Sequence, residues 1–362
     1  MHVPDGFINT PVSVAAGVVA AAAVAVSLRG ARRELGGLSS QAEGMGGERT
    51  APLAGLVAAF IFAVQMLNFP VAAGTSGHLL GGALAAILVG PYTGVLCVSV
   101  VLLMQGILFA DGGLTALGVN ITVMGVVTVV IAYGVFRGLL KLLPAGRRSV
   151  TVAAFAGALL SVPGAAAAFT AVYAVGGTTD VPLGKVLTAM VGVHVLIGIG
   201  EAAITAATVG AVIAVRPDLV HGARGLTTRL KLRIGGELVD APAPAASPVA
   251  ARSTTAVWAT GLVTALVLAG FVSFYASASP DGLEKVAADQ GIDQKVEEHA
   301  AKDSPLADYA VKDVADARLS GGLAGALGVG ATVAVGTGVF WVVRRRATAT
   351  GSDATAAEPS AV

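Results

Sequence analysis

Long apolar stretches separated by short polar segments run through most of the chain. Between positions 51 and 136 the only formally charged side chain is Asp111. About 20 apolar residues in a helix cross a bilayer, because backbone groups in lipid must be satisfied within the segment. The pattern predicts nine membrane-spanning helices, at about 8–28, 51–69, 76–90, 93–110, 114–136, 150–174, 186–215, 255–275 and 319–343. We therefore expect an all-α integral membrane protein.

The third predicted span is short and rich in glycine. Four glycines lie in or beside it, at Gly74, Gly77, Gly81 and Gly82. Glycine weakens a helix interior, so this segment is predicted to be broken or re-entrant.

Basic residues indicate the orientation of the chain. They follow the first, fifth, seventh and ninth predicted spans, at Arg29, Arg32 and Arg33, at Arg137, Lys141, Arg147 and Arg148, at Arg216, Arg224, Arg229, Lys231 and Arg233, and at Arg344, Arg345 and Arg346. Cytoplasmic loops carry an excess of such residues. Every cluster falls after an odd-numbered crossing, which predicts an outside N-terminus and a cytoplasmic C-terminus. No basic residue precedes the first apolar run, so we expect it to be a retained span rather than a secretory signal.

Composition narrows the class of protein. Of the 362 residues, 55% are hydrophobic and 12% are charged. Soluble domains carry about 25% charged residues, so an ordinary soluble enzyme is excluded. The formal net charge of +1 offers no electrostatic case for a nucleic-acid partner. The single cysteine, Cys97, excludes an intramolecular disulfide.

The segments outside the predicted spans suggest a division of the chain. Residues 241–248 are rich in proline and alanine, which is typical of an extended linker. The loop at 276–318 carries ten acidic and five basic residues, a net charge of −5, and is expected outside. The predicted parts are a seven-span domain at 1–235, a cytoplasmic linker at 236–254, a two-span module at 255–346 and a disordered cytoplasmic tail at 347–362.

The first two residues have the atoms of a metal chelate. The amine of Met1 with the amide nitrogen and imidazole Nδ1 of His2 can close a five-membered and a six-membered ring around one ion. Three nitrogens in one plane suit Ni²⁺, Cu²⁺ or Co²⁺. His78, at the outer end of the third span, lies on the same predicted side and can supply a fourth nitrogen. The alternatives are a chance histidine at position 2 and a structural hydrogen bond for His78.

Other polar residues within the predicted spans leave similar choices open. His194 and Glu201 lie seven residues apart and therefore project from one face of a helix. They can orient a metal-binding histidine, form a buried structural network, or relay protons in a secondary transporter. Five further polar residues raise the same choice between site and structure, and each singly favours a structural role: Gln65, Asn68, Gln105, Asp111 and Asn120. The sequence contains no phosphate-binding loop of the Walker type.

Several of these stretches together resemble the CbiM/NikM family, the substrate-capture membrane components of energy-coupling factor transporters for cobalt and nickel. The matching blocks are Met-His-Val-Pro-Asp-Gly-Phe at 1–7, and the segments 68–71, 74–82, 111–118 and 194–202. The run Pro280, Asp281, Gly282, Leu283 and Glu284 is similar to the PDGLE signature of CbiN/NikN-type accessory modules, which have two spans and an outside loop. The chain thus resembles a fusion of a capture and an accessory component.

The resemblance implies a fold and a metal site. The expected fold is a seven-helix capture bundle with its N-terminus outside, followed by a two-helix module. Met1, His2 and His78 are the expected metal-binding residues. Supporting roles outside the direct ligands are expected for Asn68, His194 and Glu201.

The resemblance also implies cargo, partners and location. The expected cargo is Co²⁺ for cobalamin biosynthesis, imported across the cell membrane, with Ni²⁺ as the alternative. The expected partners are an energy-coupling membrane protein similar to CbiQ and cytosolic ATPases similar to CbiO. ATP hydrolysis would take place in those partners, so the chain itself is expected to be no enzyme and to hold no permanent cofactor. A proton-driven transporter using His194 and Glu201 is the alternative from another class.

Two expectations concern metal loading. We hypothesise that the acidic loop at 276–318 promotes loading of the N-terminal chelate, the alternative being a loop that is merely solvated. Uptake should weaken at acid pH, because metal binding requires deprotonated nitrogens.

Overall fold

The computed structural model describes residues 1–36, 50–72, 74–223, 231–234, 237–240 and 254–355. Its helices are α1 (Thr10–Gly36), α2 (Thr50–Gln65), α3 (Gly82–Val89), α4 (Pro91–Leu108), α5 (Leu117–Asn120), α6 (Thr128–Leu142), α7 (Arg147–Gly176), α8 (Leu183–Val215), α9 (Thr254–Gly270), α10 (Gly282–Gln290) and α11 (Ala317–Thr355). A π-helical segment, Ile121–Val127, joins α5 to α6. Two short antiparallel hairpins add to this helical fold, β1 (Phe69–Ala72) with β2 (Thr75–Gly77) and β3 (Lys231–Ile234) with β4 (Glu237–Asp240).

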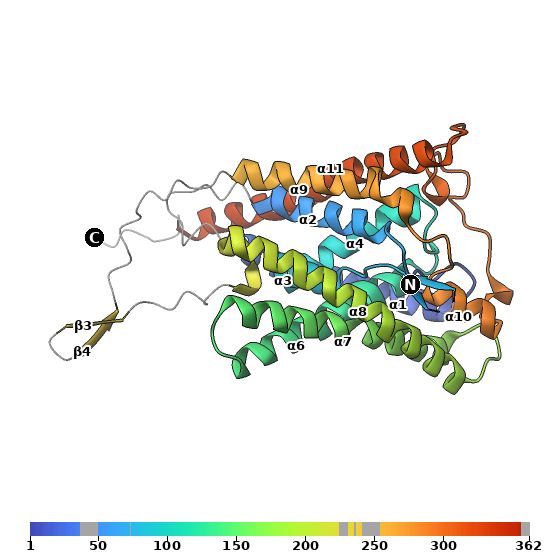
Figure 1. The fold of residues 1–362 in the computed structure, drawn as a ribbon, viewed down its shortest axis with the longest axis horizontal. Helices are drawn as coiled ribbons and strands as arrows, with labels where there is room; N and C mark the ends of the chain where they lie inside the picture. Colours follow the sequence, from blue (N-terminus) through green and yellow to red (C-terminus); the bar gives the residue numbers. More distant parts are fainter. Residues whose placement is uncertain (37–49, 73, 224–230, 235–236, 241–253, 356–362) are drawn as a thin grey trace.

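The axes of most of the long helices are roughly aligned, as Figure 1 shows. Seven of the described helices are long and apolar enough to cross a membrane: Thr10–Leu35, Pro91–Leu108, Leu117–Leu142, Arg147–Gly176, Leu183–Val215, Thr255–Tyr275 and Ala317–Arg345. The remaining two predicted spans correspond to shorter helices, α2 and α3. The multi-pass membrane architecture predicted from the sequence is confirmed.

The predicted span at 76–90 is helical only in α3, whose eight residues are all buried. Eight residues rise about 12 Å, well short of the roughly 30 Å of a hydrocarbon core. Gly81 (φ 85°) and Gly90 (φ 103°) bound the helix in backbone conformations that favour glycine. Surrounding helices cover the segment, and irregular backbone at membrane depth is tolerated where protein encloses it. The broken third span is therefore confirmed.

The segment containing α3 nevertheless joins the two ends of the bundle. His78 contacts the amine of Met1, close to where α1 begins. At the other end, Thr93 donates its backbone N–H to Glu34, in the last turns of α1, over 2.7 Å. The stretch 78–93 thus runs from the end of the bundle that holds Met1 to the end that holds Glu34, although only part of it is helical. The chain therefore still passes from one end of the bundle to the other at this point, as it does in a full span.

The last two long helices pack on the first part of the chain. Figure 1 shows α9, α2 and α11 side by side, and all three pairs are in contact. Glycine permits the close crossing of α2 and α11, because a Cβ on Gly55 would lie 2.7 Å from the backbone nitrogen of Thr337. The connection between α9 and α11 carries α10 across to α8 and β2. The C-terminal module thus reaches the segment that contains His78.

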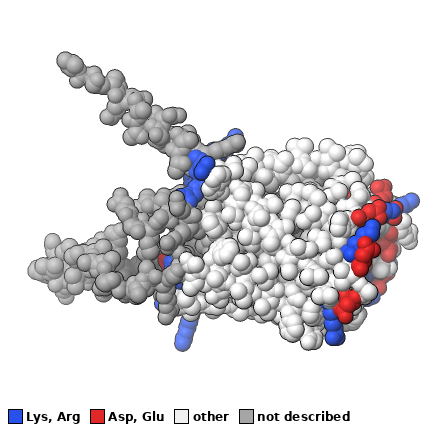
Figure 2. Space-filling view, turned by 90° about the horizontal axis from the view of Figure 1, so that it is seen from above, with Lys and Arg blue, Asp and Glu red and all other residues white. Residues whose placement is uncertain are grey.

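Charged residues gather at the two ends of the molecule. Figure 2 shows an almost uncharged band between one end with mainly basic side chains and the opposite end, where acidic and basic side chains mix. The mixed end carries α10 and the N-terminus. The predicted linker at 236–254 lies outside the described residues except for β4 (Glu237–Asp240) and Thr254, the first residue of α9. The helix α11 continues to Thr355, into the tail for which the sequence predicts disorder.

Candidate metal centre

The N-terminal tail is held in a fixed path before α1 begins. Asn120 accepts the backbone N–H of Val3 over 2.8 Å and donates to its carbonyl over 3.0 Å. Asp5 accepts hydrogen bonds from the backbone nitrogen and the hydroxyl of Thr115, at 2.8 and 2.5 Å. Met1 is 3% exposed. These bonds place the terminal amine inside the protein rather than in solvent.

His78 faces this amine. Its Nε2 lies 2.5 Å from the Met1 nitrogen, while its Nδ1 lies 3.0 Å from the carbonyl oxygen of Leu79. A proton on Nδ1 donates to that carbonyl and leaves the lone pair on Nε2, directed at the amine. The backbone N–H groups of Leu80 and Gly81 donate to the two carboxylate oxygens of Glu201, at 2.7 and 3.1 Å. Glu201 therefore fixes the backbone immediately after His78.

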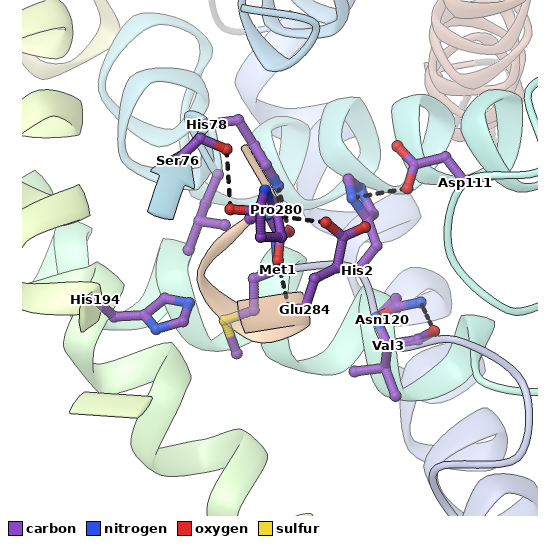
Figure 3. A network of polar contacts seen from close by, with 12 residues as sticks. Met1, His2, Val3, Ser76, His78, Asp111, Asn120, His194, Pro280 and Glu284 are labelled. Atoms are coloured by element: carbon purple, nitrogen blue, oxygen red, sulfur yellow. Dashed lines mark hydrogen bonds and ion pairs between the residues drawn. The ribbon is translucent and has the colours of Figure 1, made fainter. Parts of the chain in front are cut away.

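His2 completes the arrangement drawn in Figure 3. Its ring lies 5.0 Å from that of His78, centroid to centroid, with the planes inclined by 16°. The Nε2 atom lies 3.2 Å from Oε1 of Gln105, so a proton there leaves the lone pair on Nδ1. Nδ1 lies 3.1 Å from a carboxylate oxygen of Asp111. Burial, partly opposed by Asp111, lowers the pKa of His2 to about 4, which keeps the ring neutral near pH 7.

The two residues that contact the His2 ring, Gln105 and Asp111, are linked to each other by Tyr309 of the C-terminal module. Gln105 in α4 donates to the hydroxyl of Tyr309, in the loop before α11, over 3.0 Å. Tyr309 in turn donates to Asp111 over 2.6 Å. Burial and the Asp111 carboxylate hold the pKa of Tyr309 well above its ordinary value, so the hydroxyl keeps its proton. His2 is thus oriented by a network that includes the C-terminal module.

This donor set fits a divalent transition-metal ion. With metal–nitrogen bonds of about 2.0 Å, adjacent nitrogens in a planar centre lie about 2.8 Å apart. The amine and His78 Nε2, 2.5 Å apart, come close to that spacing. The other ring nitrogen of each histidine has a partner, as is usual for metal-binding imidazoles. Among the described residues no group of three or more His, Cys, Asp or Glu side chains forms a metal site, so this centre depends on the terminal amine.

The PDGLE segment lies directly on this centre. The Oδ2 atom of Asp281 is 2.7 Å from the amine and 3.4 Å from Nε2 of His78. Burial raises the pKa of Asp281, but the terminal ammonium and His78 outweigh it and hold this pKa well below its ordinary value. The backbone N–H of Ser76 donates to the carbonyl of Pro280 over 2.8 Å, which anchors the segment to β2.

The other residues of the signature have structural roles. A Cβ on Gly282 would lie 2.8 Å from side-chain atoms of Val193 and Ile197, so a larger residue would have to push these side chains of α8 aside. Leu283 is 1% exposed and packs in the core. Asp281 and Glu284 form a reciprocal capping box at the start of α10. The segment is therefore built to dock, with Asp281 Oδ2 directed at the amine.

The three residues expected to support the site have different surroundings in the structure. Glu201 does not contact His78 itself but binds the backbone N–H groups of Leu80 and Gly81, which follow it. His194 is fully buried, with Nδ1 2.7 Å from the carbonyl of Met190, and its Cε1 faces Gly282. Its Nε2 has no hydrogen-bond partner among the described residues. Asn68 contributes its backbone carbonyl to Ser277 over 2.7 Å, and nothing described brings its side chain to the amine.

A cavity of about 640 Å³ adjoins the centre. Both parts of the chain line it, and its charged and metal-binding side chains are His2, His78, Asp111, Asp281, Glu284, Asp308 and Arg318. Four carboxylates and a single guanidinium give this cavity an acidic lining. A cation can be drawn to the centre along such a surface.

Sequence reasoning missed parts of this site. From the sequence, Asp281 is predicted only as part of a signature, and a structural role is favoured for Gln105 and Asp111. The isolation of Asp111 in an uncharged stretch of 86 residues was a usable signal. Tyr309 has no comparable signal, because only the folded chain brings it to position 111.

Comparison with known proteins agrees with the geometry. The CbiM family, described as the cobalt uptake substrate-specific transmembrane region, matches residues 2–219, and the PDGLE domain matches 255–345. A protein of Haloquadratum walsbyi named as a metal transport protein is 40% identical over 222 residues, covering 61% of this chain and 93% of its own length.

Other relatives differ in the metal that they are named for. The fused nickel transport protein NikMN of Rhodobacter capsulatus is 42% identical over 139 residues, covering 38% of this chain and 36% of its own length. The cobalt transport protein CbiM of Geobacter sulfurreducens is 34% identical over 250 residues, covering 66% of each chain. A solved structure of a truncated transition metal transporter aligns with 59% of this chain and 99% of its own, at 24% identity and a TM-score of 0.48.

The family match extends over more than half of the 362 residues. Its relatives are metal transport proteins rather than enzymes. The chain therefore belongs to the CbiM family and is a cobalt or nickel transport component of the CbiM/NikM type that carries a C-terminal PDGLE domain.

Proposed function

We propose that this chain captures a divalent nickel or cobalt ion at its N-terminus for import. The ligands are the Met1 amine, the amide nitrogen and Nδ1 of His2, and Nε2 of His78. The observation that carries the proposal is the 2.5 Å separation of the amine from His78 Nε2 in a buried pocket. The contacts of the opposite ring nitrogens support it, because a proton on His2 Nε2 facing Gln105 and one on His78 Nδ1 facing Leu79 leave lone pairs on His2 Nδ1 and His78 Nε2.

Nickel is the cargo that we favour, ahead of the cobalt expected from the sequence. Affinity for nitrogen ligands rises from Co²⁺ to Ni²⁺, and planar nitrogen sets suit nickel. A relative in which two such components are fused is named for nickel transport. Cobalt is the second candidate, since relatives of the capture domain are named for it, and a role in cobalamin biosynthesis belongs to that alternative.

We further propose that transport is driven by partners. The family resemblance suggests an energy-coupling membrane protein of the CbiQ type and cytosolic ATPases of the CbiO type. The chain has no phosphate-binding loop of its own, which fits this division of labour. Basic side chains gather at the end opposite the centre, as Figure 2 shows. This supports a cell-membrane location with the N-terminus and the centre outside.

The test is uptake of radioactive Ni²⁺ and Co²⁺ by cells that express the full chain with candidate partners. One variant carries a leucine inserted between Met1 and His2, which moves the imidazole out of its chelate ring; leucine is chosen because methionine is retained before a bulky residue, whereas methionine before alanine is removed and the histidine would return to position 2. A matched control carries one leucine inserted within the linker at 241–248. We expect the first insertion to abolish uptake and the second to leave it unchanged. Equal uptake by both variants would refute the N-terminal site.

The same assay separates the driving forces. Uptake that requires active ATPase subunits supports the proposal. Uptake that persists without them and collapses when the proton gradient is dissipated would instead support a proton-driven transporter.

A further inference from the structure

Three donor atoms from distant parts of the chain surround one point. The Met1 amine and His78 Nε2 are 2.5 Å apart, and Asp281 Oδ2 lies 2.7 Å from the first and 3.4 Å from the second. Adjacent ligands on one ion with bonds of about 2.0 Å are separated by about 2.8 Å. The three distances bracket this value. We propose that Asp281 is an additional, oxygen ligand of the captured metal, an inference that rests on the function proposed above.

The carboxylate of Asp281 is held in place by its own segment. Its Oδ1 accepts the backbone N–H of Glu284 over 2.9 Å, and its backbone N–H donates to the Glu284 carboxylate over 2.9 Å. The hydrogen bond from Ser76 to Pro280 fixes the preceding residue. Only Oδ2 is left to face the amine, and the residue is 7% exposed. A ligand restricted in this way needs little reorganisation to bind metal.

The alternative role for Asp281 is to neutralise the terminal ammonium and to leave when metal arrives. The structure favours the ligand role because Oδ2 approaches His78 Nε2 as well as the amine. With the Nδ1 proton donated to Leu79, Nε2 and Oδ2 are two electron-pair donors facing one point. The terminal ammonium donates to both atoms when no ion is bound. When the amine gives up a proton to bind an ion, the amine nitrogen, Nε2 and Oδ2 are three donors that can face that ion together.

The cavity supplies a path to this carboxylate. Asp281 lines its wall with the acidic residues Asp111, Glu284 and Asp308. A hydrated cation arriving through this space meets carboxylate oxygens, and oxygen ligands exchange readily with water oxygens. Asp281 is the carboxylate that also contacts the amine and His78. The ion can therefore be bound by Asp281 and the nitrogens together.

The two roles predict opposite effects of one substitution. We would measure Ni²⁺ and Co²⁺ affinity of the full chain, purified in detergent, by equilibrium dialysis. Asp281→Asn removes the anionic oxygen but keeps a good N-cap for α10. If Asp281 is a ligand, Asp281→Asn should lower the metal affinity by at least about 10- to 100-fold, which is the range seen for residues that support metal sites. Unchanged or tighter binding would overturn the proposal.

Asp308→Asn is the matched control. Asp308 lines the same cavity and belongs to the same module, and its left-handed backbone (φ 53°) suits asparagine. Both substitutions remove one negative charge from the cavity. We expect Asp308→Asn to change affinity by no more than about twofold. An equal loss in both variants would show that the acids act only through the electrostatic field.

X-ray absorption on the nickel-loaded protein gives an independent readout. We expect an oxygen ligand and more than four ligands in the natural sequence, and a four-coordinate planar spectrum in Asp281→Asn. Identical spectra would overturn the proposal even if affinity differs. If a thermal melt shows that Asp281→Asn does not fold, Asp281→Ser takes its place, because serine is also a good N-cap.

The leucine insertion between Met1 and His2 separates failure of this inference from failure of the proposed function. If the natural sequence binds neither ion, or if the insertion leaves binding intact, the proposed function fails. If the natural sequence binds metal, the insertion abolishes binding and Asp281→Asn binds normally, only the role of Asp281 is wrong.

Discussion

Glu201 illustrates how a residue that is not a proposed ligand can control the metal centre. Its two carboxylate oxygens accept the N–H groups of Leu80 and Gly81, the residues that lead from His78 into α3. Glycine at position 81 adopts a positive φ of 85°, so the chain turns sharply there. The carboxylate satisfies two backbone donors that this turn removes from any helix. Glu201 therefore sets the position of His78 through the backbone.

We expect Glu201→Gln to weaken both stability and metal binding. One oxygen is replaced by an NH₂ group that faces a backbone donor, at a cost of about 1.5–3 kcal/mol for a hydrogen bond to a charged group. The matched control is Glu34→Gln, which removes a carboxylate that accepts the N–H groups of Tyr92 and Thr93 at the other end of the bundle. Thermal melts should show a similar loss for both variants, while nickel affinity should fall only in Glu201→Gln.

The same variant tests the proton-relay alternative for His194 and Glu201. A relay predicts intact metal binding with loss of transport. The structure favours the positioning role, because Nδ1 of His194 is engaged by Met190 and both Glu201 oxygens are engaged by backbone.

At the residue scale, the sequence predicts what is local and misses what is distant. The chelating atoms of Met1 and His2 are adjacent in the chain, so their chemistry is legible without a fold. Asp281 and Tyr309 reach the same site across more than 200 residues, at distances that only tertiary packing determines. Their types are common in exposed loops, and nothing in the local pattern marks them as part of a buried centre.

The N-terminal tail behaves as a structural element although it is neither helix nor strand. Asn120, the last residue of α5, bonds both backbone groups of Val3, and Gly113 also donates to the Val3 carbonyl over 2.9 Å. Val3 is fully buried, so its N–H has no access to water. The tail thus pairs with the protein as an edge strand pairs with a neighbour.

We expect Asn120→Ala to loosen the tail and weaken metal binding. The unpaired N–H of Val3 costs about 1–3 kcal/mol when it stays buried. Hydrogen exchange at the first residues should become faster, and nickel affinity should fall. Asn68→Ala is the control, since Asn68 lines the cavity beside the centre but its side chain makes no hydrogen bond with any described residue. Unchanged exchange in Asn120→Ala would contradict this account.

The elements themselves were predictable to different degrees. Long uniform runs such as those forming α7 and α8 have a hydropathy pattern that predicts a span. The segment 69–81 has no such pattern, and its hairpin depends on the pairing of Phe69 with Gly77 and on Ser76 bonding to the PDGLE segment. Its position in the fold is set by contacts with residues about 200 positions away. Sequence periodicity therefore located the break in this span but not its structure.

At the scale of the whole molecule, the C-terminal module does two things at once. Its helices α9 and α11 pack along α2, and the loop between them covers the N-terminal tail, where Glu297 donates its backbone N–H to the carbonyl of Asp5 over 3.0 Å. The acidic loop expected to promote loading therefore lies against the proposed metal centre. This placement supports the loading hypothesis over a loop that is only solvated.

The orientation of the whole molecule can be tested with single cysteines, because the only natural cysteine, Cys97, is buried. Asp293→Cys places a thiol in the acidic loop, and Ala145→Cys places one in the link between α6 and α7, both at exposed positions. The basic residues near position 145 predict a cytoplasmic location for that link. A membrane-impermeant maleimide should label Asp293→Cys in intact cells and Ala145→Cys only after permeabilisation, with the natural sequence as the unlabelled control. The reverse pattern would place the proposed metal centre on the cytoplasmic side and would contradict capture from outside.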